Sequence, residues 1–230
     1  MEQPSQMVVQ QIRLFSADIV PFYLIRTAPG AEYLKRAFAF RDSFVNENGE
    51  VAFTFGALTH EDEGVLAINL LTIGERKIVL NVAGSSGDAS RFYASLVEAV
   101  SQLSADCPLA SVKPLILTQE TTTSARLDLR WADFLAPQAV SALEGRVLAK
   151  VGIENEATIK TVGLKVVVAF SPNAELLRHG ISLADKTIII EPRINTPLED
   201  HIFFVTTPLD SATHLQLIED LERTLAPSAG

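Results

Sequence analysis

Apolar and polar residues alternate most clearly between residues 50 and 59, which predicts a half-buried antiparallel strand. One face of this strand is apolar and carries Val51, Phe53, Phe55 and Ala57. The turn before it, Asn46–Gly49, ends in Asn-Gly, which is a strong hairpin signal because both residues tolerate positive φ. We therefore expect a hairpin formed by strands Ala37–Val45 and Glu50–Thr59.

The rest of the first half divides into further strand pairs closed by one helix. Strands are expected at Val8–Phe15, Ile19–Thr27, Val65–Thr72 and Lys77–Ala83. Both faces of residues 65–71 are mostly apolar, which favours a central strand covered on both sides. The helix Asp88–Ser104 follows, with Asp88 as its N-cap. Its apolar stripe consists of Phe92, Leu96, Val97, Val100 and Leu103.

The second half restarts the same order with insertions. Strands are expected at Lys113–Thr118, Ser124–Trp131, Arg146–Ile153, Ala157–Phe170, Lys186–Arg193 and His201–Thr207. A short helix is expected at Asp133–Leu143 and an inserted loop or helical turn at residues 171–185. The chain closes with a helix at Ser211–Leu225, capped by Asp210 or Ser211. Its apolar stripe consists of Leu217, Ile218, Leu221 and Leu225.

This order of elements predicts an α+β fold in which antiparallel β-meanders pack with helices. The repeated layout suggests two similar halves, related by a pseudo-two-fold duplication, that share or abut their sheets. Runs of hairpins argue against a doubly wound parallel sheet. The corresponding units are residues 1–105 and 112–230, joined by a linker at 105–111 or merged into one domain. Sequence identity between the halves is negligible, and an α+β meander without duplication would produce the same pattern.

The phenylalanines concentrate in the first half of the chain. Phe38, Phe40 and Phe44 fall on one face of the first strand of the hairpin, and Phe53 and Phe55 share a face of the second. A packed aromatic core is the simpler interpretation, because each such ring buries a large area. The alternative is an apolar ligand pocket or a surface for a partner protein.

The composition is that of a soluble globular protein, with 47% hydrophobic and 20% charged residues among 230. The net charge of −9 repels phosphate backbones and anionic lipids, so we expect no nucleic acid and no membrane as a partner. No apolar stretch approaches the ~18 residues of a membrane helix, and the N-terminus does not resemble a secretory signal, so a cytoplasmic location is expected. The single cysteine, Cys107, excludes an internal disulfide and is interpreted as a bystander thiol.

Two segments invite a ligand-binding interpretation. Gly84–Ser90 joins a strand to a helix, where phosphate loops lie, but it lacks the spacing of the phosphate-binding fingerprints. A plain connection capped by Asp88 explains it more simply. His60–Gly64 places acidic residues beside an imidazole without the alternating spacing of a calcium loop, which is typical of a solvated hairpin tip. We therefore predict no cofactor and no metal site.

Polar side chains gather around one predicted hairpin end in the second half. The candidate binding residues there are Glu191, Arg193, Asp200 and His201, followed by Arg126 and Arg130 on the polar face of a nearby strand. A carboxylate, an imidazole and a guanidinium in one place can perform acid–base chemistry or hold an anionic substrate. Ordinary surface ion pairs are the simpler interpretation. His214 lies in the first turn of the last helix, where the helix dipole disfavours a charged imidazole.

Two classes of function remain open at this point. The absence of a catalytic motif, together with strands that are apolar on both faces, favours a non-enzymatic binding or assembly protein that acts through protein–protein contacts or self-association. The alternative is an enzyme or a binder of a small molecule, including an apolar one, with a cleft between the two halves.

Overall fold

The computed structural model of the protein describes residues 6–16, 19–60, 64–104, 107–129, 163–169, 177–178 and 184–225. Within these residues one sheet contains nine strands, all paired antiparallel, in the order β2-β3-β4-β5-β1-β6-β9-β8-β7. The strands are β1 (Gln6–Leu14), β2 (Asp42–Val45), β3 (Val51–His60), β4 (Gly64–Ile73), β5 (Lys77–Ala83), β6 (Ile116–Arg126), β7 (Leu164–Val168), β8 (Lys186–Pro192) and β9 (Ile202–Thr207). The predicted α+β fold with an antiparallel sheet is confirmed.

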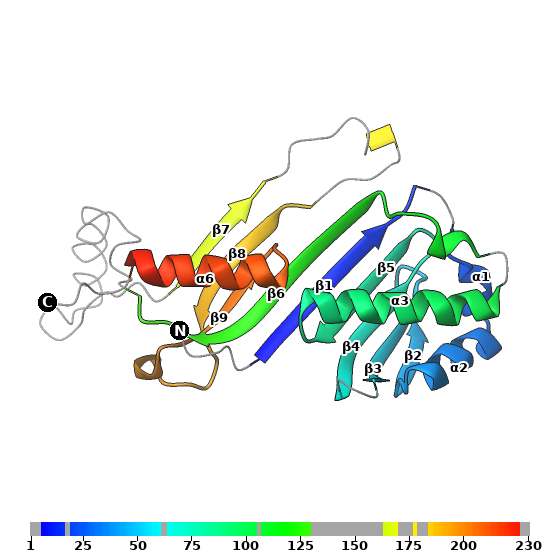
Figure 1. The fold of residues 1–230 in the computed structure, drawn as a ribbon, viewed down its shortest axis with the longest axis horizontal. Helices are drawn as coiled ribbons and strands as arrows, with labels where there is room; N and C mark the ends of the chain where they lie inside the picture. Colours follow the sequence, from blue (N-terminus) through cyan, green and yellow to red (C-terminus); the bar gives the residue numbers. More distant parts are fainter. Residues whose placement is uncertain are drawn as a thin grey trace, which may run out of the picture.

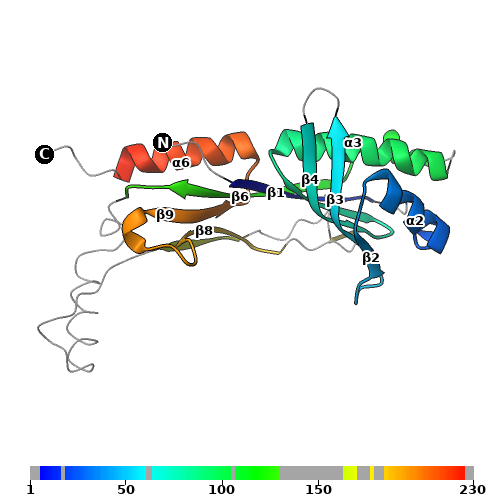
Figure 2. The same cartoon turned by 90° about the horizontal axis from the view of Figure 1, so that it is seen from below.

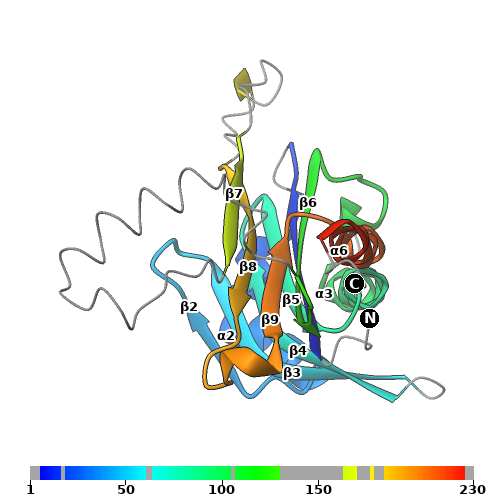
Figure 3. The same cartoon turned by 90° about the vertical axis from the view of Figure 1, so that its left-hand side faces the viewer.

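The two long helices lie on the same face of this sheet (Figures 1 and 3). They are α3 (Ser86–Leu103) and α6 (Ser211–Leu225), and they extend in opposite directions from the middle of the molecule. The shorter helices α1 (Phe22–Ile25) and α2 (Ala28–Ala37) lie near the β2 end of the sheet. Figure 2 shows β3 and β4 crossing the direction of β6 and β9, so the sheet twists strongly from one edge to the other.

Each long helix covers its own hydrophobic cluster. Beneath α3, the side chains of Phe53, Leu80, Phe92 and Leu96 are fully buried together with residues of α1 and α2. Beneath α6, a smaller cluster contains Phe203, Val205, Ile190 and Ile218. Both predicted helical stripes thus supply core residues, as expected for amphipathic helices on a sheet.

The N-terminus of α3 explains the glycine- and serine-rich segment before it. Ser85 is the N-cap, and its Oγ accepts a hydrogen bond from the Asp88 N–H at 3.2 Å. The Asp88 carboxylate accepts in return from the Ser85 N–H at 2.6 Å, which completes a capping box. A Cβ on Gly84 would lie 2.6 Å from the Asp88 Oδ2, so a larger residue here would displace this carboxylate from its capping position. The carboxylate therefore caps the helix from within, although Ser85, and not Asp88, is the N-cap.

The two sides of the sheet have corresponding strand orders when each is followed outward from the central pair, β1 and β6. Beside β1 lies β5, which leads into α3, and beside β6 lies β9, which leads into α6. Next come β4 on one side and β8 on the other. The two predicted units therefore share one sheet. That they arose by duplication, and that they form separate domains, stay predictions.

The predicted strand Ile19–Thr27 is wrong, because this segment forms α1 and leads into α2. Pro21 lacks the N–H that a strand interior needs, and the Phe22 N–H bonds locally to the Val20 oxygen. Thr27 then caps α2, since its Oγ1 accepts from the Gly30 N–H at 3.2 Å. The apolar spacing thus reflects one buried helical face.

The predicted strand Ala37–Val45 is correct only in its last four residues, which form β2. Helix α2 continues through Ala37, and the chain then turns at Ala39, whose φ is +48°. Phe38 and Phe40 have the two-residue spacing of a strand because this turn directs both rings into the core. The hairpin turn Asn46–Gly49 is confirmed, and it joins β2 to β3.

Two further predicted strands differ from the structure. The prediction placed two separate strands at Lys113–Thr118 and Ser124–Trp131. The structure has one continuous strand, β6, from Ile116 to Arg126. The threonines between the two predicted strands are β-branched and favour a strand. The prediction that both faces of β4 are covered is wrong at Val65, whose side chain is 68% exposed. The predicted elements Asp133–Leu143 and Arg146–Ile153 lie outside the described residues, as do Trp131 and most of residues 171–185.

Candidate functional site

The predicted polar cluster lies at the end of the β8–β9 hairpin where residues 193–201 connect the two strands. Glu191 pairs in register with Phe204, and the Arg193 N–H donates to the Ile202 oxygen at 2.9 Å. Asp200 ends the short 3-10 helix η3 (Leu198–Asp200). His201 follows in the left-handed region with a φ of +55°. The turn thus brings these four predicted residues to one end of the hairpin.

Arg126 ends β6 at the same end of the sheet, where it pairs in register with Ile202. Because Arg193 lies opposite Ile202 from the other side, Arg126 and Arg193 flank this residue on one face of the sheet. Arg130 lies outside the described residues.

The side chains of this cluster do not form an acid–base pair with one another. His201 Nδ1 lies 3.5 Å from the Asp128 Oδ1, and 43% of the His201 side chain and 72% of the Asp128 side chain are exposed. The Arg193 guanidinium lies 5.9 Å from the centre of the Phe204 ring, at the outer limit of a cation–π contact. Within the described part of the chain, no hydrogen bond or ion pair joins the side chains of Glu191, Arg193, Asp200, His201 and Arg126.

A buried histidine, which the sequence did not single out as an anchor, joins α6 to the sheet. His214 has no exposed surface, and its ring nitrogens lie 2.8 Å from the hydroxyls of Thr123 and Thr207. Burial lowers the pKa of His214 to about 4, so the imidazole is neutral at physiological pH. The ring therefore connects β6, β9 and α6, and its role is structural.

A second buried polar group lies beneath α3. The Arg13 Nη2 donates to the Gln11 Oε1 at 3.0 Å, and the guanidinium stacks 3.8 Å from the centre of the Tyr93 ring. Desolvation lowers the pKa of Arg13 and raises the pKa of Tyr93. Among the described residues, neither the Arg13 Nε nor the Tyr93 hydroxyl has a hydrogen-bond partner. The sequence did not predict this arrangement. Strand periodicity places Arg13 on one face of the sheet, but it does not say which face α3 covers.

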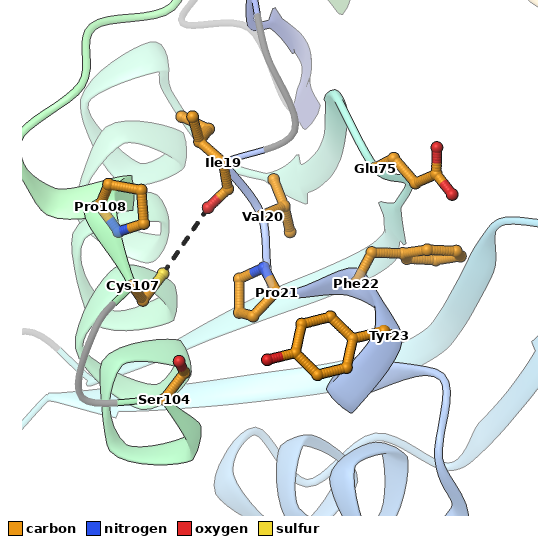
Figure 4. A pocket seen from close by; sticks show the side chains of 9 residues that line it. All are labelled: Ile19, Val20, Pro21, Phe22, Tyr23, Glu75, Ser104, Cys107 and Pro108. Atoms are coloured by element: carbon orange, nitrogen blue, oxygen red, sulfur yellow. Dashed lines mark hydrogen bonds between the residues drawn. The ribbon is translucent and has the colours of Figure 1, made fainter.

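The hollow in Figure 4 has a volume of about 410 Å³ and lies between the start of α1 and the end of α3. Its lining includes Tyr23, Glu75, Ser104 and Cys107. The Cys107 thiol is directed at the Ile19 carbonyl oxygen, 3.9 Å away, and none of the described residues that line the hollow is a histidine. A thiolate nucleophile needs a base or a positive neighbour, so this arrangement agrees with a bystander thiol.

Strand β2 ends the sheet on the side of the first half, and all four of its residues are exposed. Phe44 is 51% exposed and Val45 is 50% exposed, and they lie on opposite faces because side chains alternate along a strand. The Asn46 N–H donates to the Glu50 oxygen at 2.9 Å. By the alternation of an antiparallel ladder, the backbone groups of Phe44 therefore face β3, whereas those of Ser43 and Val45 face away from the sheet.

The aromatic residues near this edge separate into a core set and an exposed set. Phe38, Phe40 and Phe53 are buried, with ring centres 6.1 Å apart for the first two and 5.3 Å apart for Phe40 and Phe53. Phe55 is 66% exposed and has a φ of +54°, which is rare for a bulky residue. The prediction that Phe53 and Phe55 share a face is therefore wrong. The Arg41 N–H bonds to both the Thr54 and Phe55 oxygens, so the regular alternation is interrupted there.

The metal prediction can be compared with the geometry of the described residues. Among them, no group of three or more His, Cys, Asp or Glu side chains lies close enough together to hold a metal ion. A search of the same residues finds no helix with the length and apolar character needed to cross a membrane.

Comparison with known proteins adds no relative. No protein-family model matches this sequence, and no curated protein matches it.

Proposed function

We propose that this protein is a non-enzymatic binding or assembly protein that acts through protein–protein contacts, and that the β2 edge of its sheet is the contact surface. The observation that carries the proposal is the exposure of this edge. Phe44 and Val45 present apolar side chains on its two faces, and Ser43 and Val45 direct their backbone N–H and C=O groups outward. An extended segment can add to such an edge by main-chain hydrogen bonds.

The composition of β2 supports this use. Proteins that avoid edge-to-edge pairing protect their edge strands with lysine, proline or inward-pointing charges. The sequence of β2 is Asp-Ser-Phe-Val, with no lysine or proline and with its one charge, Asp42, at the end. The strand is short, which itself limits edge pairing, but its outer face lacks lysine and proline, and the apolar side chains supply contact area for a partner.

A display library of random peptides tests the proposal on the full-length protein. Peptides selected on the wild type are expected to be extended segments, and Ser43→Pro should abolish their binding, because proline removes one outward N–H without breaking the pairing of β2 with β3. Ser43→Thr keeps that N–H and should bind as the wild type does. If no selected peptide depends on Ser43 for binding, and the protein is also monomeric, the proposal loses its support.

A small-molecule function has one specific observation in its favour. Arg126 and Arg193 flank Ile202 on one face of the sheet, and neither has an acidic partner among the described residues. Two guanidinium groups in this position suit an anionic ligand. Calorimetric titration with inorganic phosphate and with succinate tests this second candidate. Binding that is lost in the Arg126→Gln, Arg193→Gln double variant favours it, and no heat of binding counts against it.

A further inference from the structure

We infer that the hollow between the start of α1 and the end of α3 is a binding site for a small organic cation, an amine that carries a short apolar group. The site is separate from the β2 edge, because none of the described residues that line the hollow belongs to β2. The experiments below therefore test it independently of the proposed contact surface.

The hollow has the size and the walls of a small-molecule site. Its volume of about 410 Å³ falls within the range that is usual for ligand pockets. Ile19, Tyr23 and Pro108 line it with accessible apolar surface, and Tyr23 is 71% exposed. Phe22, in contrast, is only 8% exposed and belongs to the core. A ligand can therefore cover apolar surface here without displacing core side chains.

The charge that faces the hollow is negative. Glu75 is the one charged side chain among the described residues that line it, and it lies in the turn between β4 and β5. Figure 4 shows Glu75 on the opposite side of the hollow from Ser104 and Cys107. Its side chain is exposed and makes no hydrogen bond or ion pair with another described residue. The carboxylate can thus turn towards a cation without losing another contact.

The two basic residues that follow Glu75 in the chain bind elsewhere. The Arg76 Nε donates to the Phe15 oxygen at 3.2 Å, and the Phe15 N–H donates to the Arg76 oxygen at 2.9 Å. The Lys77 ammonium lies 2.6 Å from the Glu50 carboxylate. These contacts fix the turn against the end of β1, so that Glu75 is held at the rim of the hollow.

The end of α3 adds to the negative potential. Ser104, the C-cap of this helix, lines the hollow. The C-terminus of a helix carries a partial negative charge, and no basic residue lies in the last turn of α3 to offset it. The Ile19 carbonyl oxygen is a further acceptor, since its contact with the weakly donating Cys107 thiol is 3.9 Å long. An ammonium group supplies both the positive charge and the donors that this surface lacks.

The same set of residues disfavours other ligands. A bound metal ion needs several protein ligands, and among the described residues no group of His, Cys, Asp or Glu supplies them. None of the described residues that line the hollow is basic, so an anion finds no counter-charge. The exposed Tyr23 ring, in contrast, can contact an ammonium group through its face or an apolar group by stacking.

Titration of the full-length protein with three ligands of similar shape is the first test. At neutral pH 2-phenylethylammonium is positive, 2-phenylethanol is neutral and phenylacetate is negative. We expect the ammonium to bind with a dissociation constant on the order of 1 mM, as suits so small a ligand. The alcohol should bind about fivefold more weakly, and phenylacetate should not saturate the site. Residue-resolved NMR should show the shifts at Tyr23, Glu75 and Ser104.

Two results of this titration would overturn the inference. One is equal affinity for the three ligands, which would show that charge plays no part. The other is that the ammonium fails to saturate these residues by about 20 mM, well above the expected dissociation constant.

Removal of the carboxylate distinguishes this site from a general attraction of cations to an acidic protein. Glu75→Gln should weaken the binding of 2-phenylethylammonium about fivefold and leave that of 2-phenylethanol unchanged. Glu47→Gln removes the same charge from the exposed Asn46–Gly49 turn and should bind as the wild type does. Equal losses in the two variants, or no loss in Glu75→Gln, would contradict the assigned site.

Tyr23 tests the aromatic wall. Its side chain is mostly exposed, so its replacement should have little effect on folding. Tyr23→Phe keeps the ring and should bind 2-phenylethylammonium within about twofold of the wild type, whereas Tyr23→Leu should bind about threefold more weakly, because it loses an exposed cation–π contact. Wild-type affinity in Tyr23→Leu would place the cation elsewhere and overturn the inference.

Discussion

The first residues of the two long helices, Ser86 and Ser211, bind each other's backbone. The Ser86 N–H donates to the Ser211 Oγ at 3.1 Å, and the Ser211 N–H donates to the Ser86 Oγ at 2.6 Å. The two hydroxyls lie 2.9 Å apart. Each serine thus satisfies an N–H group that the other helix leaves free in its first turn. This reciprocal contact joins α3 to α6 in the middle of the molecule.

Removal of either hydroxyl should weaken the start of the other helix, because the first N–H of that helix loses its acceptor. We expect Ser86→Ala and Ser211→Ala each to lower the free energy of unfolding by about 1 kcal/mol, the usual effect of losing a capping oxygen. The double variant should lose less than the sum, because both single variants remove the same bond between the two hydroxyls. Urea unfolding measures all three. Ser101→Ala on α3 is the control, since its hydroxyl bonds only to the Val97 oxygen within the helix and should have little effect.

The buried His214 should make stability depend on pH in a defined window. Its pKa is lowered to about 4 in the folded protein, against about 6.5 in an unfolded chain, so the unfolded state binds more protons between these values. The stabilisation is therefore complete above pH 6.5 and decreases as the pH falls, by about 3 kcal/mol at pH 4.

Urea unfolding from pH 7 to pH 4 tests this expectation with two variants. His214→Gln should be less stable at pH 7 but should lack this part of the pH dependence. His201→Gln is the control and should behave as the wild type does, since that side chain is partly exposed and contacts only the exposed Asp128 carboxylate among the described charged residues. A wild-type slope that His214→Gln retains in full would contradict the assignment.

Tyr93 should tolerate loss of its hydroxyl. That group is buried, and it has no hydrogen-bond partner among the described residues, so its removal lifts a desolvation penalty. We expect Tyr93→Phe to leave the free energy of unfolding unchanged or to raise it by up to about 1 kcal/mol. Tyr33→Phe is the matched control, because the Tyr33 hydroxyl donates to the Gln102 Oε1 at 2.5 Å and its loss should be neutral or slightly destabilising. A clear loss of stability in Tyr93→Phe would mean that the hydroxyl is bonded.

The two phenylalanines of the β2–β3 hairpin should differ sharply in their effect on stability. Phe53 is fully buried, so Phe53→Ala should lower the free energy of unfolding by about 3–5 kcal/mol. Phe44 is half exposed, so Phe44→Ala should change the stability of the dilute monomer by less than about 1 kcal/mol. Thermal unfolding at low protein concentration distinguishes them. Similar large losses at both positions would show that Phe44 belongs to the core.

Sequence patterns predicted the elements whose signals are local. Patterns within a few residues predict several elements of the structure. These are the Asn-Gly turn, the strands around residues 77–83 and 202–207, and the two amphipathic helices. The strand predicted at Ile19–Thr27 was wrong because α1 has only four residues, too few for the apolar spacing of a helix to be recognised. The local signals for a helix were Thr27 as an N-cap and the proline in the first turn of α2, which the prediction of strands and a turn overlooked.

The candidate residues illustrate the same limit. Hairpin pairing brought Glu191, Arg193 and His201 to one end, as the turn predicted, but not into contact with one another. The role of His214 depends on Thr123, which is 91 residues away, and no local pattern encodes that contact. The exposure of Phe44 likewise depends on the place of β2 at the end of the strand order, a property of the whole sheet.

Residue-resolved hydrogen exchange at the β2 edge tests the central claim most directly. The amides of Ser43 and Val45 face away from the sheet, and they should become protected when a peptide selected on this edge is added in excess. The Phe44 amide faces β3 and should keep the same protection throughout. Exchange at Ser43 and Val45 that stays fast in the presence of such peptides would contradict a contact surface at this edge.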